Sequence, residues 1–289
     1  MKHIFHIYHP VVVFLYIMSA LILTMLTMNP VCIAISFLAG SGYAIYLRGM
    51  RKYLKTLRFV AIIFLIIAIV NPLFNHNGIT ILFYMGDNPI TLEALLFGLA
   101  SGGMLASVMV WFTCYNVIMT NEKFLHLFGR ALPTAALMLS MIMRLLPVTR
   151  YKISRIRAAQ AAMGLNAKSG TLRQRMAHGV RISSILMSWT MEDSIETADT
   201  MNARGYGSAK RTSFSAFSWS AHDITAFAAI AALVGGTATL MILTLSQFVY
   251  YPMIGGELGS PLGIAGYAAY ALLLCFPLLL ELWETLRWR

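Results

Sequence analysis

Apolar residues dominate six stretches of the chain, and each stretch approaches the length of a membrane-spanning helix. The six stretches are residues 11–28, 31–47, 59–74, 94–119, 224–250 and 262–280. A helix needs about 20 apolar residues to cross the hydrocarbon core of a bilayer. The first three stretches are short on that measure, and Asn29-Pro30 predicts a tight turn between the first two. We therefore expect an all-α membrane protein with about six transmembrane helices.

A basic insert, residues 120–222, separates the fourth apolar stretch from the fifth. It carries most of the 22 lysines and arginines of the chain. This change of pattern predicts three parts. They are an N-terminal membrane bundle of four spans over residues 1–119, the insert, and a C-terminal pair of spans over residues 223–289.

The insert contains three stretches with helical patterns. Residues 134–146 are apolar apart from one arginine, lie between two prolines, and predict a helix at the membrane surface. Residues 148–163 place apolar side chains along one side and predict an amphipathic helix, which Gly164 caps. A second amphipathic helix is expected over residues 172–203. The insert is therefore expected to be helical and to present polar faces.

The second amphipathic helix closes with Ala203-Arg204-Gly205. An arginine in the last turn complements the helix dipole, and a glycine directly after it supplies the left-handed cap. An exposed arginine at a helix end is equally suited to bind an acidic partner. Spacing alone favours neither role for Arg204.

Composition and charge placement define the protein class. Hydrophobic residues make up 58% of the chain and charged residues 11%, whereas a soluble domain has about a quarter charged residues. Loops 75–93 and 251–261 contain no lysine or arginine, so the positive-inside rule places both termini and the insert in the cytoplasm. The net charge of +11 does not indicate a nucleic-acid-binding protein, because the basic residues lie between apolar spans.

No residue pattern predicts a cofactor or metal site. The three cysteines lie singly within apolar stretches and lack the spacing of metal ligands. His3, His6 and His9 recur at every third position, but they sit at a membrane boundary, and interfacial histidines are the simpler interpretation. The chain lacks a Gly-x4-Gly-Lys-Ser/Thr loop, so we do not expect it to bind ATP itself.

Three acidic residues, Glu192, Glu196 and Asp199, share one face of the second amphipathic helix. A solvated face, or ion pairs with arginines of a crossing helix, is the favoured interpretation. Catalytic carboxylates would require a pocket and shifted pKa values. The spans contain almost no ionisable residues, which argues against a self-contained secondary transporter.

The order of motifs in the insert resembles the T component of energy-coupling factor (ECF) transporters, which are ABC-type importers of vitamins and transition metals. The resemblance is carried by Arg144-Leu145-Leu146-Pro147, Ala159-Gln160-Ala161-Ala162-Met163-Gly164, Glu196, and Met201-Asn202-Ala203-Arg204-Gly205-Tyr206-Gly207. It spans the whole insert and agrees with the flanking spans. It is more specific than an isolated Ala-Arg-Gly would be.

The resemblance implies two long cytoplasmic coupling helices that cross as an X, each ending in an Ala-Arg-Gly motif. Each motif would dock into a groove on one of two ATPase subunits. Ala203, Arg204 and Gly205 match the second motif, and Ala162 and Gly164 match the outer positions of the first. A guanidinium at a helix end can form bidentate bonds with acidic groups in such a groove.

The chain departs from this pattern at Met163, where the first arginine is expected. Methionine forms no ionic contact, so the first docking site would rely on packing or on nearby Arg155 or Arg157. Alternatively, the two sites would face non-identical ATPases. We hypothesise asymmetric coupling in which Arg204 dominates, with Glu196 as a further supporting residue of the coupling helices.

The resemblance implies an energy-coupling subunit that is not itself an enzyme. It would link two ABC ATPase subunits to a small substrate-binding membrane subunit, the S component, for vitamin or transition-metal uptake across a prokaryotic plasma membrane. Two alternatives remain. A conventional ABC permease would line its own path with polar residues, and a membrane-embedded enzyme would use the acidic face of the second amphipathic helix.

Overall fold

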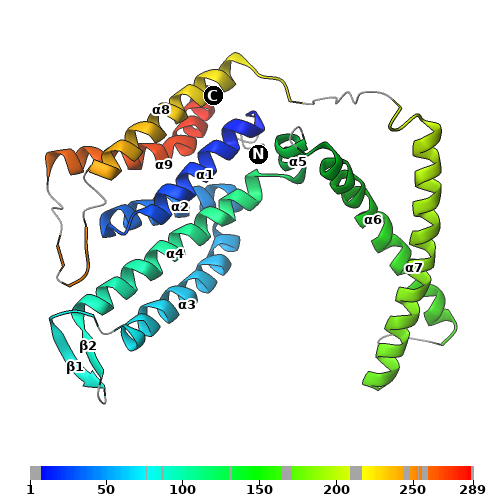
Figure 1. Ribbon diagram of the computed structural model, residues 1–289, viewed down its shortest axis with the longest axis horizontal. Coiled ribbons are helices and arrows are strands. Elements are labelled where there is room, and N and C mark those ends of the chain that lie inside the picture. The colour runs from blue at the N-terminus through cyan, green and yellow to red at the C-terminus, as the bar shows by residue number, and fades with distance from the viewer. Residues whose placement is uncertain are drawn as a thin grey trace. The chain divides into compact units, whose positions relative to one another are not determined.

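The computed structural model describes residues 8–75, 77–85, 88–129, 132–164, 171–208, 217–243, 248–252, 254–255 and 260–287. Within these residues the chain is helical apart from one two-stranded hairpin and an isolated bridge, which confirms the predicted all-α class (Figure 1). The chain divides into two compact units. The membrane unit comprises Met1–Phe124 and Phe217–Arg289, and the paired-helix unit comprises Leu125–Ala216.

Five helices in the described part of the chain are long and apolar enough to span a membrane. They are α2 (Pro30–Arg48), α3 (Met50–Phe74), α4 (Leu92–Ile118), α8 (Ala221–Leu243) and α9 (Pro261–Arg287). The first predicted span is the shorter α1 (Pro10–Leu26), an apolar helix of 17 residues. Asn29 caps α2 and Pro30 occupies its first position, so the chain turns before α1 reaches the predicted length.

Helix α4 lies at the centre of the membrane unit and packs against α1, α2 and α3, while α9 packs against α2 and α8. Trp111 of α4 is fully buried, and its Nε1–H donates a hydrogen bond of 3.1 Å to the Ser36 hydroxyl of α2. The Tyr16 hydroxyl of α1 donates to the Leu274 carbonyl of α9 at 3.0 Å. Polar atoms in an apolar core are tolerated when they are hydrogen-bonded, so these contacts fix the helix partners.

The small residues spaced four apart on α4 form the contact with α3. A Cβ added at Gly98 would meet the Ala68 carbonyl oxygen at 3.1 Å, and one at Gly102 would meet the Phe64 carbonyl oxygen at 3.1 Å. The absence of side chains therefore allows the two helix backbones to approach closely. The stripe therefore serves helix packing inside the bundle.

Long helices of the chain contain prolines beyond their first turn. Helix α6 (Pro133–Ala162) runs through Pro147 as one helix of 30 residues, so the prediction of separate helices over 134–146 and 148–163 was wrong. Helix α3 likewise contains Pro72. An internal proline removes one backbone hydrogen bond and bends the helix, but packing along a long helix outweighs that local loss.

A hairpin that the sequence did not predict precedes α4. Strand β1 (Ile81–Met85) pairs antiparallel with β2 (Asn88–Thr91). The Thr91 hydroxyl caps α4, and the buried carboxylate of Glu93 accepts a hydrogen bond of 2.7 Å from the Thr80 hydroxyl. A short helix, α5 (Asn121–Gly129), follows α4.

Candidate docking site on the paired helices

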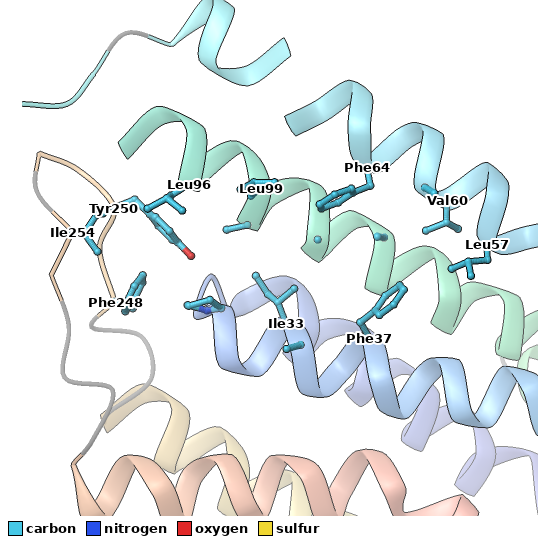
Figure 2. A pocket seen from close by; sticks show the side chains of 16 residues that line it. Ile33, Phe37, Leu57, Val60, Phe64, Leu96, Leu99, Phe248, Tyr250 and Ile254 are labelled. Atoms are coloured by element: carbon cyan, nitrogen blue, oxygen red, sulfur yellow. The ribbon is translucent and has the colours of Figure 1, made fainter. Parts of the chain in front are cut away.

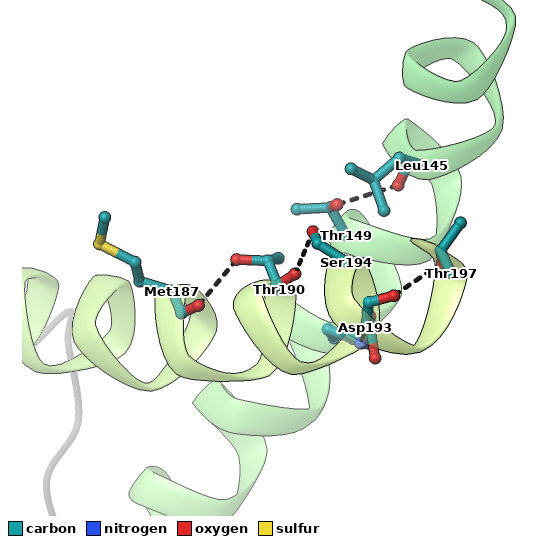
Figure 3. A network of polar contacts seen from close by, with 8 residues as sticks. Leu145, Thr149, Met187, Thr190, Asp193, Ser194 and Thr197 are labelled. Atoms are coloured by element: carbon teal, nitrogen blue, oxygen red, sulfur yellow. Dashed lines mark hydrogen bonds and ion pairs between the residues drawn. The ribbon is translucent and has the colours of Figure 1, made fainter. Parts of the chain in front are cut away.

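The paired-helix unit is built on α6 and α7 (Leu172–Ala203), which contact each other and cross (Figures 1 and 3). The bounds of α7 match the predicted helix over residues 172–203. Its start is fixed by a capping box, in which Thr171 and Gln174 exchange hydrogen bonds between side chain and backbone. Most side chains of both helices are exposed.

The two helices end in the same backbone conformation. The residue that follows α6, Met163, has φ −85° and ψ 10°, and the residue that follows α7, Arg204, has φ −81° and ψ 4°. The glycine after each of them is left-handed, with φ 78° at Gly164 and φ 77° at Gly205. Only glycine adopts this conformation without steric cost, so both predicted glycine caps are confirmed.

The backbone hydrogen bonds donated by the two capping glycines are also equivalent. The Gly164 N–H donates to the Ala161 carbonyl at 3.0 Å, and the Gly205 N–H donates to the Asn202 carbonyl at 2.9 Å. At the end of α7 the Tyr206 N–H also donates to the Met201 carbonyl at 3.1 Å, which completes a Schellman motif. The Ala-Met-Gly and Ala-Arg-Gly segments therefore present matched helix ends that differ in one side chain.

All six residues of the two helix ends are exposed, and so are Arg155, Arg157 and Glu196. The Met163 side chain is 67% exposed, which is unusual for an apolar residue without a partner surface. The Arg155 guanidinium lies 5.6 Å from the centre of the Tyr151 ring. These residues do not converge on a pocket; they form two separate protruding ends.

An ion pair that the sequence did not predict joins the helices where they cross. Lys152 of α6 donates to the carboxylate of Asp193 of α7, and its Nζ also lies 5.8 Å from the centre of the Trp189 ring. For Glu192, Glu196 and Asp199 the sequence favoured a solvated face or ion pairs; all three are exposed, and no ion pair of theirs is found in the described part of the chain.

Helix α7 also carries an exposed apolar stripe along one face. The stripe consists of Met176, Val180, Met187, Met191 and Ile195, each at least 61% exposed. Positions four or seven residues apart fall on the same side of a helix. Five large apolar side chains on one exposed face indicate a surface that is covered by a partner or by lipid.

The membrane unit holds a cavity of about 520 Å³ bounded by α2, α3, α4 and the side chains of Phe248, Tyr250 and Ile254 (Figure 2). Its lining is apolar apart from the Tyr250 hydroxyl, which already donates a hydrogen bond of 2.8 Å to the Met28 carbonyl. A translocation path for a polar solute requires free polar groups facing the solute. This cavity does not offer them, so the structure lends no support to a permease path at this place.

No protein-family model matches the chain. The chain is similar to curated proteins described as energy-coupling factor transporter transmembrane protein EcfT. The relative from Bacillus selenitireducens is 26% identical over 224 residues, which cover 70% of this chain and 80% of the relative.

Two further relatives match a shorter part of the chain. The EcfT protein of Lactobacillus helveticus is 31% identical over 114 residues, which cover 39% of this chain and 41% of the relative. EcfT 1 of Listeria monocytogenes is 33% identical over 106 residues, which cover 36% of this chain and 40% of the relative. Together with the all-α membrane fold, these similarities support the interpretation of the chain as a transmembrane T component of energy-coupling factor transporters.

Proposed function

We propose that this protein is the energy-coupling subunit of an ECF-type importer, and that the ends of α6 and α7 dock onto two cytoplasmic ATPase subunits. The observation that carries the proposal is the pair of matched, exposed helix ends at Met163 and Arg204. A single capped end is ordinary in proteins. Two ends with the same dihedral angles and the same left-handed glycine suit two related binding sites on a dimeric partner.

The two docking ends bind with unequal strength in this proposal. Arg204 presents a planar cation that forms charge-assisted hydrogen bonds with carboxylates in a groove. Met163 presents a flexible apolar side chain that fills a hollow by packing alone. Arg155 and Arg157 lie about two turns before Met163 and supply positive charge on the same arm, and Glu196 lies about two turns before Arg204 on α7.

The S component is proposed to rest on the exposed apolar stripe of α7. A small hydrophobic membrane subunit offers an apolar surface, and covering five large apolar side chains removes them from water. The lysines and arginines of the membrane unit support a cytoplasmic position for the paired helices and both termini. The complex would then lie in a prokaryotic plasma membrane.

The work of this subunit in the proposal is mechanical. ATP binding and hydrolysis in the ATPase subunits move the two docked ends, and α6 and α7 pass that motion to the membrane unit and the S component. The S component then reorients and releases a vitamin or a transition-metal ion into the cytoplasm. ATP chemistry and substrate recognition belong to the partners, so this chain needs no catalytic residue of its own.

Co-purification tests the proposal most directly. Pull-down of two nucleotide-binding subunits together with a small hydrophobic subunit is the expected result, and Arg204→Ala should release the ATPases and abolish uptake. Met163→Ala should weaken both only slightly, since packing by one methionine contributes less than a charged contact. Equal losses in the two variants would overturn the asymmetry. A monomeric protein with intrinsic turnover would overturn the proposed function itself.

A further inference from the structure

The ion pair between Lys152 and Asp193 lies at equal sequence distance from the two docking ends. Eleven residues separate Lys152 from Met163 on α6, and eleven separate Asp193 from Arg204 on α7. At a rise of about 1.5 Å per residue, each helical arm beyond the ion pair is about 16 Å long. The crossing therefore divides the pair into two arms of the same length, and each arm ends in the same glycine-capped conformation.

The ion pair is held more firmly than an ordinary surface contact. The Lys152 side chain is 19% exposed and the Asp193 side chain 42%, and the Trp189 ring lies beside the Lys152 ammonium group. Buried Ile156 follows one turn later on the same face of α6. Partial burial strengthens an ion pair and reduces its screening by salt. The aromatic ring limits the positions that the ammonium group can occupy.

Other polar groups near the crossing are satisfied within their own helix. The hydroxyls of Thr190, Ser194 and Thr197 donate to carbonyls three or four residues earlier on α7, and Thr149 does the same on α6 (Figure 3). These groups do not specify how one helix sits against the other. Among the described residues, Lys152 and Asp193 make the ion pair that does.

We propose that Lys152 and Asp193 are positioning residues that set the crossing point of α6 and α7, and so set the separation of the two ATPase-docking ends. This inference rests on the proposed function. If α7 slid by one helical turn against α6, the ion pair would break and one arm would become about 5.4 Å longer than the other. A fixed crossing with equal arms transfers the movement of both ATPases to the membrane as one motion.

The role differs from binding of the ATPases. Removing either charge leaves Arg204, Met163 and both glycine caps in place, so the ATPase subunits still dock. The separation of the docking ends then varies. Part of each ATPase movement slides α6 against α7 and is not transmitted to the membrane unit. Uptake should fall while ATP hydrolysis continues, so the number of ATP molecules hydrolysed per imported substrate should rise several-fold.

Spin labels on the two arms measure the separation directly. Ala158 and Ala198 are exposed alanines beyond the crossing, and both are replaced by labelled cysteine after the native cysteines are changed to alanine. In the complete complex we expect one narrow distance distribution. It should broaden in Lys152→Met and in Asp193→Asn and become narrow again in the charge-reversed double variant Lys152→Asp/Asp193→Lys.

The matched controls are Lys152→Arg and Glu192→Gln. The first keeps the positive charge at the crossing, and the second removes an exposed acid beside Asp193 that makes no ion pair in the described part of the chain. Both should retain the narrow distribution and the native ATP-to-substrate ratio in proteoliposomes. The positioning role would be overturned if Lys152→Met and Asp193→Asn kept the narrow distance distribution and the native ATP-to-substrate ratio. It would also be overturned if the charge-reversed double variant restored neither the distribution nor the ratio.

The outcomes separate this inference from the proposed function. If the native chain does not pull down the ATPases, the proposed function fails whatever the spin labels show. If the ATPases bind to the native chain and to both single variants, while distances and ratio stay native, only the positioning role fails. Loss of ATPase binding in Lys152→Met with the narrow distribution intact would make Lys152 a docking residue and would also overturn the inference.

Discussion

The backbone N–H of His9 donates a hydrogen bond of 2.9 Å to the Oδ1 atom of Asp223, and this bond joins the starts of α1 and α8 across 214 residues. The other carboxylate oxygen of Asp223 accepts from the backbone and the hydroxyl of Ser220, which caps α8. His9 caps α1 in turn and stacks on Trp219, with ring centres 4.2 Å apart. One buried carboxylate therefore holds two helix starts together at the point where the chain returns from the paired helices.

Replacing Asp223 should destabilise the membrane unit. Asp223→Ala leaves the His9 N–H buried without its acceptor and removes part of the α8 cap, at a cost of about 2–4 kcal/mol. Asp223→Asn keeps one acceptor oxygen for the His9 N–H but places an NH2 donor against the Ser220 N–H, so it should cost about 1–3 kcal/mol, less than the alanine variant. Thermal unfolding in detergent measures both. The neighbouring exposed His222→Ala is the control and should change little. A similar loss in His222→Ala would show that the carboxylate is not the cause.

Lys123 should make stability depend on pH in the alkaline range. Its side chain is 1% exposed, its Nζ has no hydrogen-bond partner in the described part of the chain, and burial lowers its pKa from 10.5 to about 8. Below pH 8 the lysine is charged in both states, and the folded state bears the full cost of burying the charge. Between pH 8 and 10.5 the unfolded state binds more protons, so stability should rise with pH.

Lys123→Met tests this directly. The variant should be more stable at pH 7 by up to about 3 kcal/mol, and its advantage should shrink as pH rises toward 10.5. Melting temperatures over this pH range are the measurement. Lys55→Met, at an exposed position, should show no such trend. An advantage of Lys123→Met that is the same at both ends of the range would contradict a buried charge at this residue.

Met163→Arg should strengthen the weaker docking end. It restores the charged side chain at an end whose backbone already matches that of Arg204, and a net gain of about 1.5–3 kcal/mol corresponds to about 10- to 100-fold tighter ATPase binding. The affinity of the purified chain for its ATPase subunits is the measurement. Met163→Leu keeps an apolar side chain and should leave affinity nearly unchanged. Weaker binding by Met163→Arg would mean that the partner groove at this end is apolar.

Features encoded within a few consecutive residues were predictable from the sequence. The ends of both long helices followed from one glycine each, at Gly164 and Gly205, because a left-handed cap is a local property of the backbone. The passage of α6 through Pro147 was not predictable, since it depends on whether the whole helix outweighs one local defect.

Contacts between segments far apart in the chain could not be predicted from the sequence, for a different reason. The pairing of Lys152 with Asp193 depends on the register between two helices, and helix patterns define faces without defining which residues meet. The bond from His9 to Asp223 joins residues that no periodicity connects. Charge and spacing placed Glu192, Glu196 and Asp199 on one face of α7, but the acid that forms the ion pair is Asp193.

Two glycines of α7 offer a matched test of its docking end. Gly205 has φ 77°, and a Cβ there would lie 3.1 Å from the Ser208 hydroxyl oxygen, so Gly205→Ala strains the cap by about 1–2 kcal/mol. Gly179 lies within the helix, and a Cβ added there would meet no neighbouring atom within 4 Å, so Gly179→Ala should stabilise α7 by about 0.5–1 kcal/mol.

The two variants should therefore change helix stability in opposite directions and affect docking differently. Gly205→Ala moves the Arg204 side chain by unwinding the last turn, so ATPase binding and uptake should fall. Gly179→Ala lies more than 20 residues from that end and should leave both unchanged. Circular dichroism of the purified chain and pull-down of the ATPases are the two measurements. Normal ATPase binding by Gly205→Ala would show that binding does not depend on the conformation of this cap.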